Sequence, residues 1–270
     1  MRIPNIFFCT MNLWIFFELS KKKNPMSLGE EVEKISGNLV QNLNDTKVLE
    51  KQIYLLNRLK KQYIILPFKG ITFSSSGDRC SIIYKRMKES LLELVQKPKS
   101  RRLETEEKVL AIFYKIVYGV AQIHNLRFNH RDLKLENYFI DRKNRVYLAN
   151  FTSCRIYFPD TPQIYPTSSS LHYASPEIYD KTPHFGPEAD VWALGVIFYL
   201  LLTKYFPFSG SIPSQVHQDI IEQCREKVWH PDPSLEIPPT SIFLLSQIFV
   251  YDATKRITVP ELLSALEKYK

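Results

Sequence analysis

One polar stretch constrains this chain more than any other: residues 130–137 read His-Arg-Asp-Leu-Lys-Leu-Glu-Asn. Residues 104–126 before it carry apolar side chains at helical spacing and predict a long, buried helix. Residues 138–140 and 146–149 after it predict two short strands joined by a turn. The stretch is therefore either a chance polar loop or a chemical site held between a helix and a hairpin, and its flanks favour the site.

The stretch resembles the catalytic loop of protein kinases, H-R-D-L-x-x-x-N, without a gap. The resemblance implies that Asp132 accepts the proton of a substrate hydroxyl and that Asn137 holds a magnesium ion. It also implies that Lys134 neutralises the transferring phosphoryl group, and a Lys there resembles the serine/threonine type of kinase rather than the tyrosine type. We expect ATP and Mg²⁺ as cofactors if the chain is active, and none if it is not.

Composition and charge fit a large globular domain or two lobes. With 270 residues, 44% of them hydrophobic, the chain can bury a sizeable core. The net charge of +8 is spread along the sequence, and the densest basic pieces, residues 21–23 and 97–102, are not interleaved with aromatics that could stack on bases. Solvated loops are favoured over contacts with an acidic partner, and no nucleic acid is expected.

The four cysteines, Cys9, Cys80, Cys154 and Cys224, lie far apart and form no C-x-x-C pair. This spacing argues against a zinc site or a disulfide framework and fits a reducing compartment. We therefore expect an intracellular protein, cytoplasmic or nuclear.

The first 19 residues are apolar and aromatic, and lysines follow at 21–23. A signal peptide would need a basic start and a small-residue cleavage site, and the run is short for a membrane span. Two β-strands, at residues 6–10 and 13–19, are favoured over a targeting segment, which stays open as the alternative. No membrane association is expected.

The beginning of the chain departs from the kinase pattern. A strand at 13–19 and a helix at 46–59 are similar to the kinase strand and helix whose Lys and Glu pair to hold the ATP phosphates. At those two positions the chain has Ser20 and Gln52, and no G-x-G-x-x-G precedes the helix. The resemblance therefore implies that the lid over the phosphates is missing, and a truncated gene model would explain the same pattern.

Residues 64–73 and 80–87 predict two further strands around a turn at 74–78. By the resemblance, Tyr84 would guard the back of the nucleotide pocket. Residues 85–87, ending at Met87, would form the hinge whose backbone contacts adenine.

The departure with the greatest chemical consequence is Asn150-Phe151-Thr152, which stands where kinases have D-F-G. The Asp of that triplet chelates the magnesium that bridges the phosphates. Asn150 is neutral, and it offers a hard dication one carbonyl oxygen and no charge. Together with Ser20 and Gln52, it favours a catalytically impaired protein over an active enzyme that binds metal in a variant geometry.

Residues 150–177 correspond to the activation segment, which ends in Ala-Ser-Pro-Glu for the kinase A-P-E. Ser170 stands where the hydroxyl usually bonds the catalytic Asp and Lys. Four other hydroxyl residues are either phosphorylation sites that Arg131 would read or ordinary loop residues: Thr161, Thr167, Ser168 and Ser169.

The second half of the chain fits the helical kinase lobe. Residues 190–195, Asp-Val-Trp-Ala-Leu-Gly, resemble the start of a central helix whose Asp190 braces the catalytic loop. Arg256 matches the Arg that pairs with Glu177, and a buried pair of this kind mainly fixes geometry. Further helices are predicted at residues 214–224, 241–251 and 259–269.

The expected fold class is α+β, one bilobal protein-kinase-like domain over residues 1–270. It would have a truncated N-terminal β lobe at 1–87 and a complete helical C-terminal lobe at 88–270. Residues 146–151 and 204–213 also resemble the Tribbles-related pseudokinases, which keep the H-R-D loop, lose D-F-G and act largely as adaptors for signalling kinases and a ubiquitin ligase.

We therefore expect a serine/threonine kinase-like protein that is catalytically impaired and acts as a monomeric signalling scaffold or adaptor for protein partners. The alternative is an active ATP-dependent serine/threonine kinase that uses Asp132, Lys134 and Asn137 on protein substrates. A membrane-anchored or secreted form of either depends on residues 1–19 alone.

Overall fold

The computed structural model describes residues 54–55, 57–59, 64–66, 68–73, 80–84, 87, 89–97, 100–151, 153–162, 170–184 and 186–270. The chain divides into two compact units, one formed by residues 1–51 with 67–86 and a larger one formed by residues 52–66 with 87–270. The strands predicted at 6–10 and 13–19, and the positions Ser20 and Gln52, lie outside the described residues.

The described part of the smaller unit is a hairpin. β1 (Phe68–Phe73) pairs antiparallel with β2 (Cys80–Tyr84), which confirms two strands on either side of the turn predicted at 74–78. The first strand is shorter than the predicted run from residue 64. Residues 64–66 do not belong to it, since Ile65 forms a parallel bridge with Leu148 instead.

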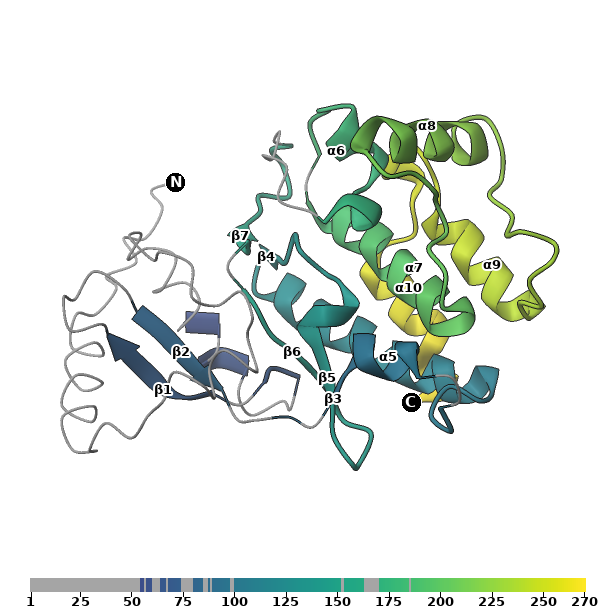
Figure 1. The fold of residues 1–270 in the computed structure, drawn as a ribbon. Helices are drawn as coiled ribbons and strands as arrows, with labels where there is room; N and C mark the ends of the chain where they lie inside the picture. Colours follow the sequence, from purple (N-terminus) through teal and green to yellow (C-terminus); the bar gives the residue numbers. More distant parts are fainter. Residues whose placement is uncertain are drawn as a thin grey trace. The chain divides into compact units, whose positions relative to one another are not determined.

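Two long helices, α5 and α7, form the centre of the larger unit. α5 (Glu106–Asn125) buries the apolar face predicted for residues 104–126. α7 (Pro187–Thr203) is buried almost all round, as expected for a central helix. The two helices contact each other (Figure 1), and the rings of Phe113 and Phe198 stack with 4.3 Å between their centroids.

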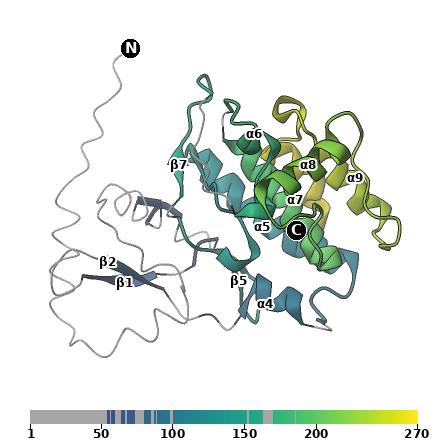
Figure 2. The ribbon, with the colours of Figure 1, turned by 45° about the horizontal axis from the view of Figure 1, so that its top comes forward.

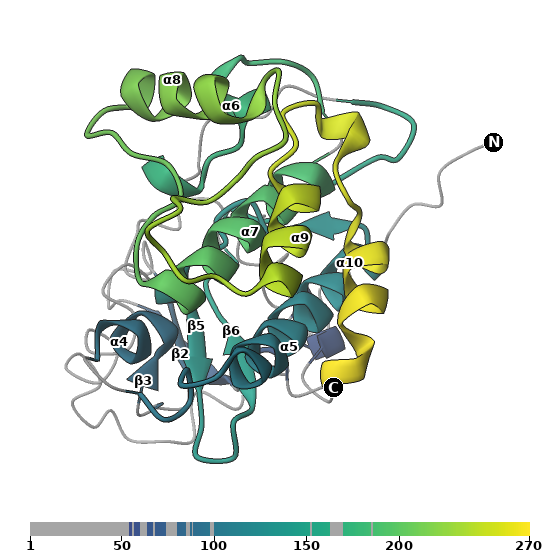
Figure 3. The ribbon, with the colours of Figure 1, turned by 90° about the vertical axis from the view of Figure 1, so that its right-hand side faces the viewer.

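Two shorter helices cover this centre. α9 (Pro239–Ile248) packs against α7, and α10 (Val259–Leu266) packs against α5 (Figure 3). α9 ends before the predicted end at residue 251. The reason is a tertiary contact: Phe249 leaves the helix and packs its ring edge-on against Trp192, with 5.1 Å between centroids.

A small antiparallel sheet of the order β3-β5-β6 precedes and follows the polar loop in sequence. Its strands are β3 (Glu89–Ser90), β5 (Tyr138–Ile140) and β6 (Val146–Leu148), so the hairpin predicted after the loop is confirmed. Ile65 adds a parallel bridge to β6. α4 (Leu91–Gln96) follows β3 and begins with a capping box.

The other described elements are two short strands, two helices and four 3-10 turns. They are β4 (Phe128–Asn129) paired with β7 (Arg155–Ile156), α6 (Pro176–Tyr179), α8 (Pro213–Cys224), and the 3-10 turns η2 (Leu135–Asn137), η3 (Leu171–Tyr173), η4 (Ala253–Lys255) and η5 (Glu267–Tyr269). α6 and α8 lie side by side (Figure 2). In the described ranges, every helix is too short or too polar to cross a bilayer.

Candidate active site

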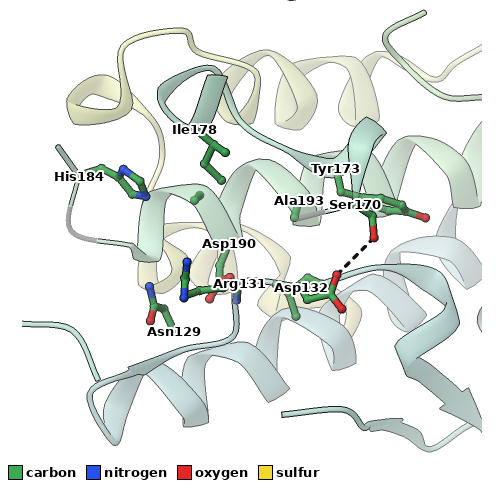
Figure 4. A pocket seen from close by; sticks show the side chains of 11 residues that line it. Asn129, Arg131, Asp132, Ser170, Tyr173, Ile178, His184, Asp190 and Ala193 are labelled. Atoms are coloured by element: carbon green, nitrogen blue, oxygen red, sulfur yellow. Dashed lines mark hydrogen bonds between the residues drawn. The ribbon is translucent and has the colours of Figure 1, made fainter. Parts of the chain in front are cut away.

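The backbone of the polar loop is held by one buried carboxylate, Asp190, from the first turn of α7. Its Oδ2 accepts a hydrogen bond from the backbone N–H of His130 (2.7 Å), and its Oδ1 accepts one from the N–H of Arg131 (2.8 Å). Figure 4 shows Asp190 beside Arg131 at this point. Arg131 has a left-handed backbone conformation (φ 69°), which is uncommon for a bulky residue and is maintained here by the contact with Asp190.

His124, at the end of α5, is a further partner of Asp190 that the sequence motif did not indicate. Its Nε2 lies 2.9 Å from Asp190 Oδ2. Burial alone would raise the pKa of Asp190, but the hydrogen bond and charge of His124, the charge of His130 and the N–H of Arg131 lower that pKa below its ordinary value. In the sequence, the signal that could have indicated this role of His124 is a titratable side chain in the last turn of an apolar helix.

Asp132, the expected proton acceptor, lies together with Lys134 and Ser170. Lys134 Nζ is 3.1 Å from Asp132 Oδ2 and donates a hydrogen bond to Ser170 Oγ at 3.0 Å. The Ser170 hydroxyl donates to Asp132 Oδ1 at 3.3 Å, the bond drawn in Figure 4. Such an arrangement is chemically able to take a proton from an alcohol while the ammonium group stabilises a phosphoryl group.

The amide groups of Asn137 and Asn150 face the same carboxylate. Asn137 Nδ2 donates to the main-chain oxygen of Asp132 at 2.7 Å and lies 3.3 Å from its Oδ2. Asn150 Nδ2 donates to Asp132 Oδ2 at 3.4 Å and to Asn137 Oδ1 at 3.3 Å. Asn150 has a left-handed backbone (φ 61°), a conformation that Asn tolerates better than most residues.

A magnesium ion, which the sequence motif implies, does not fit this arrangement. Mg²⁺ requires oxygen ligands at about 2.0–2.1 Å in near-octahedral geometry. Asn137 Oδ1, the oxygen expected to hold it, and Asp132 Oδ2 both accept hydrogen bonds from the amide nitrogen of Asn150. A cation would therefore have to displace a hydrogen-bond donor. Elsewhere in the part of the chain that the structure describes, no group of three or more His, Cys, Asp or Glu is placed to hold a metal.

The end of the activation segment is joined to the helical lobe by Glu177 and Arg256. Arg256 Nη1 donates to Glu177 Oε1 at 2.8 Å and Nη2 donates to Oε2 at 3.0 Å, so the pair is bidentate. Burial alone would raise the pKa of Glu177, but the charge and hydrogen bonds of Arg256 lower it below its ordinary value.

The other expected site residues belong to other parts of the chain or lie outside the described residues. Tyr84 ends β2 of the smaller unit, and Met87 is half-buried in the larger unit. Thr161 is exposed, and the guanidinium of Arg131 donates to the main-chain oxygen of Ser153 at 3.4 Å. Three hydroxyl residues of the segment lie outside the described residues: Thr167, Ser168 and Ser169.

Comparison with known proteins agrees with the geometry of the loop. The family model described as "Protein kinase domain" matches residues 32–266. A maternal embryonic leucine zipper kinase from Xenopus laevis is 34% identical over 167 residues, which is 59% of this chain. The probable serine/threonine-protein kinase HSL1 from Saccharomyces cerevisiae is 36% identical over 168 residues, or 61% of the chain. The human NUAK family SNF1-like kinase 2 is 25% identical over 233 residues, or 86% of the chain.

The relatives are much longer than the region they share with this chain. The aligned region covers 24% of the Xenopus protein, 10% of the yeast protein and 35% of the human protein. The similarity therefore concerns a part of each relative.

Proposed function

Because the chain belongs to the protein kinase family, we propose that it is a serine/threonine kinase-like protein impaired in phosphoryl transfer, acting as a signalling scaffold or adaptor for protein partners. Its fold is that of a kinase domain, α+β, with a small sheet-containing lobe and a helical lobe. Kinases bind the metal with the Asp of D-F-G, and this chain has Asn150 at that position.

The main support for an impaired site is the pair of hydrogen bonds that the amide nitrogen of Asn150 donates. This nitrogen donates to Asn137 Oδ1, the oxygen expected to hold a catalytic cation, and to Asp132 Oδ2 of the expected proton acceptor. The Asp that kinases use at this position would add a negative charge and put a second oxygen in place of that donor. Without them, the site has lost its strongest attraction for a dication.

The contacts that hold the polar loop and the end of the activation segment are present although Asn150 replaces Asp. This supports a scaffold role. Asp190 receives the backbone of the loop and Arg256 pairs with Glu177, and neither network includes Asn150. The loop can therefore keep its shape without nucleotide. The resemblance of residues 146–151 and 204–213 to Tribbles-related pseudokinases points to the same adaptor role, and the buried, free thiols of Cys154 and Cys224 fit an intracellular protein.

A thermal shift experiment tests the proposal. The protein is heated with ATP alone and with ATP plus Mg²⁺ or Mn²⁺, beside Asn150→Asp and the matched control Asn144→Asp. Asn144 is exposed and also has a left-handed backbone (φ 55°), so the control adds the same charge away from the site. A ligand at 100 times its dissociation constant stabilises the folded state by about 2.7 kcal/mol.

We expect a metal-dependent shift for Asn150→Asp only. A metal-dependent shift of the unchanged protein, as large as that of Asn150→Asp, would overturn the impaired-site proposal.

The arrangement of Asp132, Lys134 and Ser170 favours a second candidate, an active serine/threonine kinase. In that case Asp132 would accept the proton of the substrate hydroxyl, and Lys134 would stabilise the phosphoryl group. Phosphate transfer to a generic protein substrate, measured for the unchanged protein and for Asp132→Ala, separates the candidates. Equal rates for the two proteins would exclude the active kinase, whereas a rate lost in Asp132→Ala would favour it.

A further inference from the structure

A groove of about 680 Å³ lies between the segments that precede and follow α8. No residue of the polar loop lines it. It is lined by the end of α7 with the segment that follows it, by α8, and by the segment between α8 and α9. We define the docking groove by six of its lining residues: Tyr199, Tyr205, Phe206, Asp219, Trp229 and Asp232.

One wall of the docking groove is an aromatic surface that is open to solvent. Tyr205 is 66% exposed and Phe206 is 42% exposed. Adjacent exposed aromatic side chains that line a hollow are typical of interaction sites rather than of ordinary surface.

This wall is held in shape before any partner binds. The N–H of Tyr205 donates to Thr203 Oγ1 at 3.1 Å. The ring of Phe206 stacks on His172 with 4.5 Å between centroids and meets Tyr173 edge-on at 5.6 Å. A preformed aromatic surface costs less ordering entropy when a peptide binds to it.

Charge in the docking groove is opposite in sign to that of the whole chain. The chain carries +8, whereas the described lining includes Asp219 and Asp232 and contains neither Lys nor Arg. Asp219 is fixed by hydrogen bonds from the backbone N–H of Ser209 (2.7 Å) and from Gln223 Nε2 (2.9 Å). The N–H and hydroxyl of Ser234 lower the pKa of Asp232 below its ordinary value.

We propose that the docking groove binds a cationic peptide segment of a protein partner, in which arginine or lysine stands beside proline or apolar residues. The aromatic rings offer faces for a guanidinium or ammonium group and for proline rings. The two carboxylates supply the charge complement to a cationic segment. The inference names a partner class for the adaptor, but the binding itself does not depend on whether the polar loop transfers phosphate.

Fluorescence anisotropy on the full chain tests the inference with three labelled octapeptides, in which proline alternates with arginine, glutamine or glutamate. We expect saturable, salt-sensitive binding of the arginine peptide and weaker binding of the other two. Tyr205→Ala and Asp232→Asn should each weaken binding of the arginine peptide about fivefold, which corresponds to the loss of one exposed cation–π or ion-pair contact.

Two substitutions outside the groove serve as matched controls. Phe243→Ala removes an aromatic ring that is 63% exposed on α9, and Asp160→Asn removes an exposed carboxylate. Both should leave binding unchanged, and near-ultraviolet circular dichroism checks that every variant is folded.

Equal affinity for the arginine and glutamate peptides would overturn the proposal, as would effects of Tyr205→Ala and Asp232→Asn no larger than those of the controls. A dimer in sedimentation that Tyr205→Ala dissociates, with no peptide bound, would assign the groove to a second copy instead and would also overturn it. Asn150→Asp should not change peptide binding, so failure of this inference and failure of the impaired-site proposal are separately visible.

Discussion

Among single residues, Asn129 has a polar side chain that its buried surroundings do not match. It ends β4 directly before the polar loop, is 0% exposed, and has a side-chain oxygen and nitrogen without a hydrogen-bond partner in the described part of the chain. Figure 4 shows it at the edge of a cavity of about 10 Å³ that Arg131 and Asp190 also line. Burying an unpaired amide costs roughly 1–3 kcal/mol.

Asn129→Leu, which is close to isosteric, should therefore raise the free energy of unfolding by about 1 kcal/mol. Urea denaturation measures the change. Asn125→Leu at the exposed end of α5 is the control and should change stability by less than about 0.5 kcal/mol. A clear loss of stability in Asn129→Leu would show that the amide binds a buried water, for which the cavity is just large enough.

The polar loop could be predicted from the sequence at this scale because its members are neighbours in the chain. Asp132, Lys134 and Asn137 fall within one short motif. His124 and Asp190 are 66 positions apart, and only the packing of α5 on α7 brings them together. The roles of the site residues remain predictions, since geometry shows their contacts and not their chemistry.

Helices and strands were predictable where one face is apolar. α5 and α10 follow from the spacing of their buried residues, whereas α7 is buried almost all round and was expected from the resemblance of residues 190–195. The end of α9 and the start of β1 were missed, because the aromatic contact of Phe249 and the bridge of Ile65 to Leu148 are tertiary contacts.

Two helical glycines allow a test of how closely α7 packs. A Cβ at Gly195 in α7 would lie 2.4 Å from Ile248 Cγ2 and 2.8 Å from Phe249 Cε1, whereas a Cβ at Gly119 in α5 would lie 3.7 Å from Ile64 Cβ. Gly195→Ala should lower the free energy of unfolding by about 1–3 kcal/mol, because overpacking outweighs helix propensity.

Gly119→Ala is the matched control, and it should raise stability by up to about 1 kcal/mol. Thermal and urea unfolding of both variants measure the difference. Equal effects of the two substitutions would mean that α9 does not pack against α7 at Gly195.

The Glu177–Arg256 pair joins the activation segment to the turn before α10, and its side chains are 5% and 0% exposed. Arg256→Met leaves a buried carboxylate without its counter-charge and should cost about 3–5 kcal/mol at pH 7. In the variant, burial is no longer opposed and the pKa of Glu177 rises, so the deficit should shrink as the pH falls from 7 toward 4.

Lys255→Met is the control for this prediction. Its ammonium group pairs with Asp252, but the side chain is 77% exposed, so the change should stay within about 0.5 kcal/mol. If Arg256→Met were no more harmful than Lys255→Met at pH 7, the pair would not contribute to stability.

For the whole molecule, stability should depend on pH through the groups that the fold shields from water. Burial lowers the pKa of His130 below its ordinary value, although the charges of Asp190 and Asp132 partly oppose this effect. The pKa values of Asp190 and Glu177 are also lowered. In each case the unfolded chain takes up protons at a higher pH than the folded chain does, so the free energy of unfolding falls as the pH falls.

Two declines should therefore appear in urea denaturation measured from pH 8 to pH 3. The first begins near pH 6.5, the ordinary pKa of histidine, with a slope of at most about 1.4 kcal/mol per pH unit for one proton. The second begins near pH 4, where Asp and Glu of the unfolded chain become protonated, and it is steeper because at least two carboxylates contribute. His130→Phe should remove the first decline and keep the second, whereas the exposed His230→Phe should keep both. A first decline that persists in His130→Phe would place its origin in another group, since only a buried imidazole that must charge on unfolding produces this sign in that range of pH.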